Sequence, residues 1–309
     1  MRKWLAPGLV AVVIAWYGLA PLGFGGWHHA LEGTPADLGV AFETVTFQPR
    51  DQPLLLRGWS MQPAGARGAL VMVHGGGNNR SQLHNEWLKL AAALTQRGYG
   101  VLSIDLRNHG ESGDTALGPT FGPDEANDVI GAVDLLRRRD PALPVGAIGF
   151  SMGGQTAIYA AAADPRLQAV VSDATYTDTV SITPAFAHAS TGLPAWLFGA
   201  PFLWSAQHLH GLQVDRARAV DVIGALAPRP VLLIHDVDDP IVPVEQARAL
   251  AGACKSAELW VTSTPPEQLP ERMRGRWGTH AQSYALQPDA YATRVAAFFD
   301  RAFAAPPPS

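Results

Sequence analysis

One pentapeptide in this chain has the spacing of a hydrolytic nucleophile. Residues 149–153, Gly-Phe-Ser-Met-Gly, fit the pattern G-x-S-x-G, in which a serine lies at a sharp turn between a strand and a helix. The apolar run at 145–148 predicts a buried strand before the turn, and the helix-forming residues at 155–163 predict a helix after it. A serine held there stands clear of the sheet, beside the free N–H groups and partial positive charge of a helix start. Ser151 is therefore the candidate nucleophile.

A serine hydroxyl is a weak nucleophile at neutral pH and needs a neighbouring base that is itself oriented by an acid. The base is expected after the last predicted strand and before the last helix, where His280 stands. The acid is expected after the predicted strand at 230–235, where Asp239 stands. Asp238 in the same loop and Asp173 after an earlier strand are alternative acids. Most chains contain serine, histidine and aspartate, so the presence of the three residue types is weak evidence for a catalytic triad. Their positions in loops that follow predicted strands are much stronger evidence.

Short apolar runs alternate with helical patterns along most of the chain, which indicates a mostly parallel α/β sheet flanked by helices. The first two strands, at 41–48 and 54–61, are separated by a turn-forming segment and predict an antiparallel hairpin at the sheet edge. Further strands are predicted at 69–74, 99–106, 145–148, 167–172, 230–235 and 258–262, and helices at 82–97, 125–139, 155–163, 244–253 and 289–303. The alternation breaks at 174–218, where prolines and aromatic residues predict a small helical insertion over the site.

The sequence resembles the α/β-hydrolase superfamily, in its branch of single-domain serine esterases and prolyl-oligopeptidase-like hydrolases. The similarity covers residues 42–303. It rests on the nucleophile pentapeptide, on His280 and on three segments, His74-Gly-Gly-Gly77, Asp105-Leu-Arg-Asn-His-Gly-Glu-Ser-Gly113 and Asp239-Pro-Ile-Val-Pro243. The resemblance implies an α/β-hydrolase fold with a mostly parallel, eight-stranded sheet, and a catalytic triad in the chain order nucleophile, acid, base.

The resemblance also implies roles for individual residues. Asp239 is favoured over Asp238 as the acid because it precedes Pro-Ile-Val-Pro, as the acid of the family does. The main-chain N–H groups of Gly76 and Met152 would form the oxyanion hole. The activity implied is cleavage of an ester or amide through an acyl-enzyme intermediate, with Ser151 as nucleophile and with no cofactor and no metal.

Several chemistries share this machinery and stay open. Esterase activity on a small-molecule substrate is favoured, because the small insertion leaves no peptide-binding propeller domain. Peptidase, thioesterase and acyl-transfer activities remain alternatives. Haloalkane dehalogenation is disfavoured, since it needs a carboxylate where Ser151 stands. The alternative from another class is a catalytically silent α/β-hydrolase fold used for binding, because fold does not imply function.

The composition limits the other classes of function. The chain has 309 residues, 47% of them hydrophobic and 16% charged, which suits one large α/β domain. A net charge of −4 without a Lys/Arg-rich run gives no electrostatic reason to expect nucleic acid as a partner. The lone Cys254 excludes an intrachain disulfide framework and lacks partners for a zinc site.

The resemblance implies that His74 and His109 hold their loops by hydrogen bonds.

The N-terminal segment, 1–27, predicts a membrane anchor or a signal. Arg2 and Lys3 precede an uncharged run from Trp4 to Trp27, whose 24 residues are enough to cross a bilayer core. An uncleaved anchor is favoured, with the lipid bilayer as partner and, by the positive-inside rule, the catalytic domain outside the cytoplasm. A cleaved signal that gives a secreted enzyme, or a buried helix, stays open. The remaining chain divides into a linker at 28–39, the hydrolase domain at 40–304 and a disordered proline-rich tail at 305–309.

Overall fold

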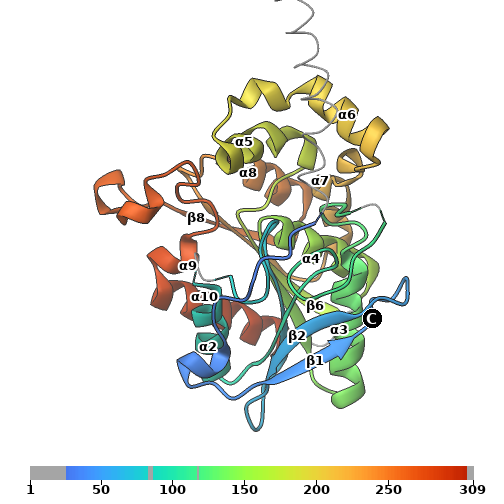
Figure 1. Cartoon of the computed structure of the whole chain (residues 1–309). Coiled ribbons are helices and arrows are strands. Elements are labelled where there is room, and N and C mark those ends of the chain that lie inside the picture. Colours follow the sequence, from blue (N-terminus) through green and yellow to red (C-terminus); the bar gives the residue numbers. More distant parts are fainter. Residues whose placement is uncertain (1–25, 83–85, 117, 305–309) are drawn as a thin grey trace, which may run out of the picture.

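Eight strands form one mixed sheet, in the order β1-β2-β4-β3-β5-β6-β7-β8 (Figure 1). The computed structural model describes residues 26–82, 86–116 and 118–304. The strands are β1 (Glu43–Phe47), β2 (Leu56–Met61), β3 (Ala69–Val73), β4 (Gly100–Ile104), β5 (Val145–Phe150), β6 (Leu167–Asp173), β7 (Val231–Asp236) and β8 (Ala257–Thr262). β2 pairs antiparallel with both β1 and β4, and all other neighbours are parallel. The predicted sheet, with its antiparallel hairpin at one edge, is confirmed.

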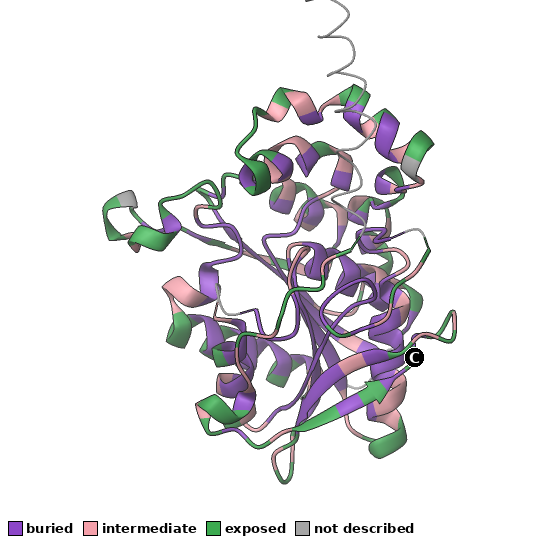
Figure 2. Cartoon of the chain, in the orientation of Figure 1, coloured by how far each residue is buried: buried purple, intermediate pink, exposed green. Residues whose placement is uncertain are grey.

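Helices cover both faces of this sheet. They are α2 (Trp87–Gln96), α3 (Ala126–Arg139), α4 (Met152–Ala163), α5 (Thr179–Thr191), α6 (Ala200–His210), α7 (Ala219–Val222), α8 (Val244–Ala253), α9 (Ser283–Leu286) and α10 (Pro288–Ala304). Alternate residues of a strand point to opposite faces, so Val71 and Val73 pack with α3 and α4, whereas Leu70 and Met72 pack with α2 and α10. Burial on both faces, shown in purple in Figure 2, explains why the central strands are mostly apolar.

The helix predicted at 82–97 begins only at Trp87. Gln82 and Glu86 have positive φ angles, of 20° and 60°, which a right-handed helix excludes. The side chain of Asn79 turns the chain instead, because its Oδ1 accepts a hydrogen bond from the N–H of Ser81 at 2.9 Å. The segment before α2 is therefore a loop at the carboxyl edge of the sheet rather than a first helical turn.

The insertion at 174–218 folds as α5, α6 and two 3₁₀-helices, η4 (Ala195–Phe198) and η5 (Val214–Arg216), at the top of Figure 1. Phe198 and Phe202 are buried with Ala187 of α5, whereas Trp196 and Trp204 are 74% and 56% exposed. The aromatic residues of this stretch are thus divided between the interior of the insertion and its surface. Four further 3₁₀-helices lie elsewhere in the described chain: η2 (Pro35–Leu38), η6 (Ile223–Leu226), η7 (Pro266–Gln268) and η8 (Glu271–Met273).

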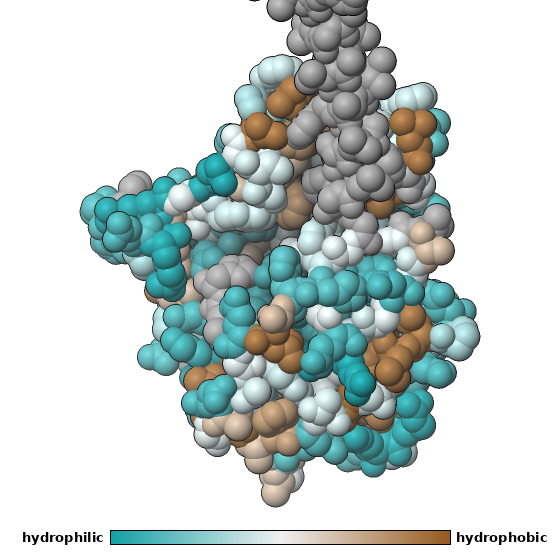
Figure 3. All heavy atoms as spheres, in the orientation of Figure 1, coloured by the Kyte–Doolittle hydropathy of each residue, from teal (hydrophilic) through white to brown (hydrophobic). Residues whose placement is uncertain are grey.

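The connection between β8 and α9 carries η7 and η8 away from the sheet, in orange in Figure 1. Figure 3 shows this projection in teal, because its side chains are mostly polar or charged. Its end returns to the body of the protein, where the ring of Trp277 lies 5.5 Å from that of Phe186 in α5. The connection is therefore solvated along its outer part and in contact with the insertion at its end.

The first described residues lie against the loop after β4. The N–H of Trp27 donates to the carbonyl O of Asn108 at 2.7 Å, and the His28 ring bonds to Gly110 at 2.8 Å and Asp114 at 2.7 Å. The segment predicted as a linker thus contacts the domain. The predicted N-terminal anchor, up to residue 25, and the proline-rich tail lie outside the described residues. Among the residues that the structure describes, none of the helices has the length and apolar character needed to cross a bilayer.

Candidate active site

Ser151 lies at a strained turn between β5 and α4. Its φ and ψ angles are 53° and −118°, a conformation that residues other than glycine rarely adopt. Its N–H donates to the carbonyl O of Asp173 at 2.8 Å, and α4 begins at the next residue, earlier than predicted. A Cβ at Gly149 would overlap the carbonyl of Gly153, and a Cβ at Gly153 would overlap that of Val73. The two glycines therefore make the turn possible, and the turn holds the serine hydroxyl at the carboxyl edge of the sheet.

Ser151, His280 and Asp239 form one series of hydrogen bonds. Nε2 of His280 lies 3.0 Å from Oγ of Ser151, and Nδ1 of the same ring lies 2.7 Å from Oδ2 of Asp239. The three residues follow β5, β7 and β8, whose carboxyl ends lie at one edge of the sheet. Asp239 and His280 are each 7% exposed, so little water competes for these bonds. The structure thus brings together the three residues that the sequence singled out.

The other partners of Asp239 decide the direction of this series. Its Oδ1 accepts hydrogen bonds from the N–H groups of Ile241 at 2.8 Å and Val242 at 2.9 Å, which leaves Oδ2 to face His280. A carboxylate only accepts, so this network assigns the ring proton to Nδ1 and leaves Nε2 as an acceptor for the Ser151 hydroxyl. The arrangement can therefore remove a proton from the serine.

The neighbouring carboxyl groups have different partners. Asp238 is exposed, and its N–H donates to Oδ1 of Asp236 at 3.1 Å. Oδ2 of Asp236 accepts a hydrogen bond from the hydroxyl of Thr262 at 3.1 Å. Asp173 is fully buried and accepts the hydroxyl of Ser283 at 3.2 Å. Burial raises the pKa of the Asp173 carboxyl to about 7. None of these bonds includes the histidine of the series, so the geometry favours neither alternative acid.

The two predicted oxyanion residues lie beside the serine. Met152 is the first residue of α4, so its N–H has no acceptor within the helix. A Cβ at Gly76 would lie 3.5 Å from Sδ of Met152, and a Cβ at Gly75 would lie 3.7 Å from Cβ of Ser151. The glycines let the loop after β3 approach Ser151 closely, because any side chain there would occupy the space beside the serine.

His74 and His109 hold the loops around the site. Nδ1 of His74 donates to the carbonyl O of Gly75 at 2.8 Å, and its Nε2 accepts the N–H of Leu106 at 3.1 Å. Nδ1 of His109 donates to the carbonyl O of Arg107 at 2.8 Å. Both rings are buried, which lowers the pKa of His74 to about 4 and that of His109 to about 3. Both are therefore neutral at neutral pH and have the structural role that the resemblance implied.

Sequence reasoning missed a buried ion pair beneath the glycine-rich loop. Arg80 is 1% exposed, its guanidinium bonds to Asp105 and Glu111, and it lies 4.6 Å from the ring centroid of Trp59. Asp105 also accepts the N–H groups of Arg80 at 2.7 Å and Glu111 at 2.9 Å. These charge-assisted bonds join the loops after β3 and β4 and hold the glycine-rich loop in place. An arginine just after the glycines, with an aspartate ending the next predicted strand, was the signal available in the sequence.

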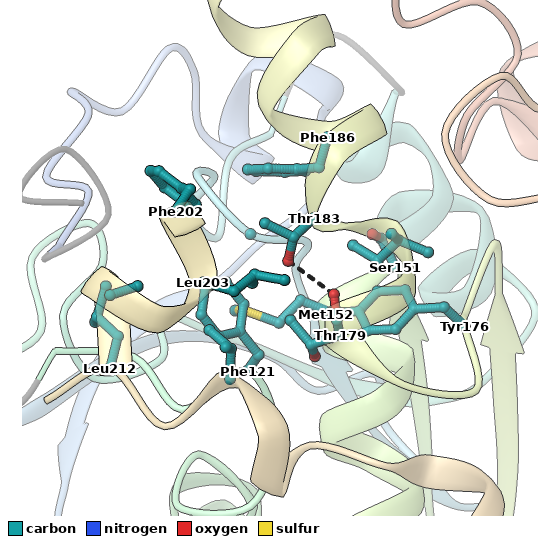
Figure 4. Close-up of a pocket in the computed structure, with 14 residues that line it drawn as sticks. Phe121, Ser151, Met152, Tyr176, Thr179, Thr183, Phe186, Phe202, Leu203 and Leu212 are labelled. Carbon is teal, nitrogen blue, oxygen red and sulfur yellow. Dashed lines mark hydrogen bonds between the residues drawn. The ribbon is translucent and has the colours of Figure 1, made fainter. Parts of the chain in front are cut away.

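Two pockets meet at Ser151. The first, termed the insertion pocket, lies between the insertion and the sheet and has a volume of about 530 Å³, its open mouth included. It is lined by Gly76, Phe121, Ser151, Met152, Tyr176, Thr179, Ile182, Thr183, Phe186, Phe202, Leu203, Ala206, Leu212 and Val214. Figure 4 shows Ser151 on one side of it and Leu212 on the opposite side. The lining is mostly apolar, and the hydroxyl of Thr183, one of its few polar groups, is bonded to the carbonyl O of Thr179 at 2.8 Å.

The second pocket, termed the histidine pocket, has a volume of about 390 Å³, mouth included. It is lined by Gly75, Gly76, Asn78, Gln82, Phe150, Ser151, Phe186, Trp277, His280, Ala281 and Gln282. Three side-chain amides make it more polar than the insertion pocket. Among the described residues, no Asp, Glu, Lys or Arg side chain lines either pocket. In the same part of the chain, no cluster of three or more His, Cys, Asp or Glu is arranged to hold a metal ion.

The chain is similar to known proteins in sequence and in fold. Residues 68–222 match the family described as alpha/beta hydrolase fold. The protein YfhR of Salmonella typhi is 26% identical over 235 residues, which cover 70% of each chain. The esterase Pf2001 of Pyrococcus furiosus has a TM-score of 0.73 at 24% identity, over 90% of this chain and 97% of that one. The acylaminoacyl peptidase of Pyrococcus horikoshii has a TM-score of 0.58 at 18% identity, over 84% of this chain and 42% of the peptidase. With half of its residues matched by the family, the chain belongs to the α/β-hydrolase fold family.

Proposed function

We propose that this protein is a serine hydrolase that cleaves an ester through an acyl-enzyme intermediate. The observation that carries the proposal is the series of hydrogen bonds from Ser151 through His280 to Asp239, at the point where two pockets meet. A serine on a strained turn, an imidazole with a free acceptor nitrogen and a buried carboxylate are the components that nucleophilic acyl transfer needs.

In the first half of the reaction, Oγ of Ser151 attacks the carbonyl carbon while Nε2 of His280 takes the hydroxyl proton. Asp239 orients the ring and stabilises the imidazolium that forms. The carbonyl oxygen becomes an anion, which the N–H groups of Gly76 and Met152 stabilise, each by about 3 kcal/mol. Nε2 then returns the proton to the leaving alcohol. In the second half, a water molecule loses a proton to Nε2 and attacks the acyl-serine. Nε2 then gives this proton to Oγ of Ser151 as the acid is released.

The absence of charged side chains from the lining of both described pockets favours an ester over a free peptide. The terminal ammonium or carboxylate of a short peptide would be desolvated without a partner, which is unfavourable. The extent of the matches supports the same choice, because the chain aligns with 97% of the Pyrococcus esterase and with 42% of the peptidase. The same residues could cleave amides and thioesters. The rates measured on the ester, the thioester and the amide of one acid would therefore rank the three activities.

Fluorophosphonate labelling and hydrolysis of p-nitrophenyl butyrate test the proposal. The wild-type protein should be labelled at Ser151 and should hydrolyse the ester. Ser151→Ala and His280→Ala should each lower kcat by several orders of magnitude, and the double variant should be little worse than either, because the residues act as a unit. A folded protein that is neither labelled nor active would be the catalytically silent binding protein instead. Full activity in Ser151→Ala would refute the mechanism.

We propose further that the N-terminal segment holds the enzyme at a membrane, with the catalytic domain outside the cytoplasm. Support comes from the sequence, in which Arg2 and Lys3 precede the long uncharged run. The first described part of the chain adds a geometric point, since the ring of Trp27 lies 6.3 Å from that of Phe121 in the insertion pocket. An anchored enzyme would therefore carry this pocket close to the point of attachment. Secretion after signal cleavage is the alternative.

A further inference from the structure

We propose that the insertion pocket binds the acyl group of the substrate and the histidine pocket its alcohol. The substrate class is then esters of an uncharged, medium-length aliphatic acid with a short polar alcohol. This assignment rests on the proposed function of Ser151 as the nucleophile. It adds to that function an orientation for the substrate and a residue, Leu212, that limits the length of the acyl chain.

The position of His280 decides which part of the substrate enters which pocket. Nε2 must lie within hydrogen-bond reach of the leaving oxygen to return the proton, so the alcohol lies on the side of this ring. His280 lines the histidine pocket and does not line the insertion pocket. The carbonyl oxygen is directed to the N–H of Gly76, which lies where the two pockets meet. The acyl chain is the remaining substituent, and the insertion pocket is the space left for it.

The lining of the insertion pocket matches an apolar, uncharged chain. Phe186 and Phe202 line it from α5 and α6, and Leu203 and Leu212 add aliphatic surface. Tyr176 carries the one ionisable side chain of the described lining, and its burial raises the pKa of the phenol, so the group stays neutral. A charged group on the acid would therefore be desolvated without a partner. Each methylene held in such a pocket changes kcat/KM by roughly tenfold or more.

The far side of this pocket sets a length limit. Figure 4 shows Leu212 across the pocket from Ser151, with Met152 between them. Leu212 is 4% exposed and belongs to the hydrophobic core, so its side chain is held in place rather than free to swing aside. An acyl chain that extends from Ser151 over Met152 meets this leucine.

The histidine pocket suits a short polar group. Asn78, Gln82 and Gln282 place side-chain amides in its lining, and Trp277, 40% exposed, lies at its outer side. Oε1 of Gln282 is buried and has no hydrogen-bond partner among the residues that the structure describes. Asn78 is held by a 3.1 Å bond from its Nδ2 to the carbonyl O of Gly76. Polar atoms of the alcohol thus find side-chain amides here, which the lining of the insertion pocket lacks.

Two isomeric esters separate the two orientations. Methyl octanoate and heptyl acetate have the same composition and similar hydrophobicity, but the long chain lies on the acyl side in the first and on the alcohol side in the second. The wild-type enzyme should prefer methyl octanoate in kcat/KM by about tenfold or more. Leu212→Trp should lower the ratio of kcat/KM for methyl octanoate to kcat/KM for heptyl acetate by about tenfold or more. Leu209→Trp, the same change at a 59% exposed position of α6, is the control and should change neither isomer.

A second variant covers the possibility that the added indole prevents folding. Leu212→Ala should shift the preferred length in a series of p-nitrophenyl esters to longer acyl chains, and thermal unfolding should show that both variants are folded. A preference for heptyl acetate that Leu212→Trp removes would reverse the assignment. Equal effects of Leu212→Trp and Leu209→Trp would also overturn it. If the wild-type protein cleaves neither isomer and Ser151 is not labelled by fluorophosphonate, the proposed function itself fails.

Discussion

Replacement of Asp239 by asparagine should remove most activity from a folded protein, because it reverses one hydrogen bond. Oδ1 of Asp239 accepts the N–H groups of Ile241 and Val242 at 2.8 and 2.9 Å. In Asp239→Asn the amide oxygen must take this place, since an amide NH₂ there would face two donors. The NH₂ group then occupies the position 2.7 Å from Nδ1 of His280 and donates to it. The ring proton moves to Nε2, which can no longer accept the proton of Ser151.

A histidine held in the wrong tautomer lowers kcat by about 10⁴-fold, which corresponds to about 5 kcal/mol in activation free energy. KM should change little, because Asp239 lines neither pocket. Asp238→Asn is the matched control. It makes the same chemical change at an exposed side chain one residue away, and it should alter stability by no more than about 0.5 kcal/mol and leave kcat near the wild-type value.

The assay is kcat and KM on p-nitrophenyl butyrate, together with urea unfolding and the rate of fluorophosphonate labelling. The reasoning is refuted if Asp239→Asn is folded and keeps most of its kcat. Loss of activity in Asp238→Asn, with Asp239→Asn still active, would show that the acid has been assigned to the wrong carboxylate. Equal losses in both variants, with unfolding at lower urea, would mean that the loop and not the hydrogen bond had been disturbed.

Three further predictions concern stability and location. Gly153→Ala should lower the free energy of unfolding by about 1–3 kcal/mol, because the added Cβ would overlap the carbonyl of Val73. Gly252→Ala is the control, since this glycine of α8 has open space around it, and it should raise the free energy of unfolding by up to about 1 kcal/mol. Urea unfolding measures both changes. Burial raises the pKa of Asp173 to about 7, so the protonated carboxyl stabilises the folded state. This contribution to the free energy of unfolding is complete below the ordinary carboxyl pKa and is lost as the pH rises through 7. Asp173→Asn should therefore weaken the fall in stability between about pH 4 and pH 8, and an unchanged slope would contradict the assignment. The full-length protein should stay with membranes through high-salt and carbonate washes. A form that begins at residue 26 should be active in the absence of membranes. An N-terminus found near residue 21 would instead indicate a cleaved signal.

Local patterns were enough to predict the sheet and the candidate nucleophile. A buried parallel strand must be apolar on both faces, so β3, β4 and β5 stand out as short hydrophobic runs. The turn at Ser151 needs glycines on both sides, because the strand and helix approach too closely for a Cβ. These glycines are close neighbours of Ser151 in the sequence, so a local pattern is enough to recognise the turn. Since parallel strands end at the same edge, the loops with Asp239 and His280 could be assigned to the same side of the sheet before their geometry was known.

Three features depended on contacts between residues far apart in the chain. The choice between Asp238 and Asp239 rests on which carboxylate the loop turns toward a histidine 41 residues beyond Asp239. The 174–218 insertion has apolar residues on several sides of its helices, so its pattern did not show that Phe202 would face the pocket and Trp204 the solvent. The Arg80–Asp105 pair joins two loops, and a buried charge of this kind is stable only when its partner is in place. Residue type and order thus predicted which groups could react, whereas long-range packing decided their partners and the shape of the pockets around them.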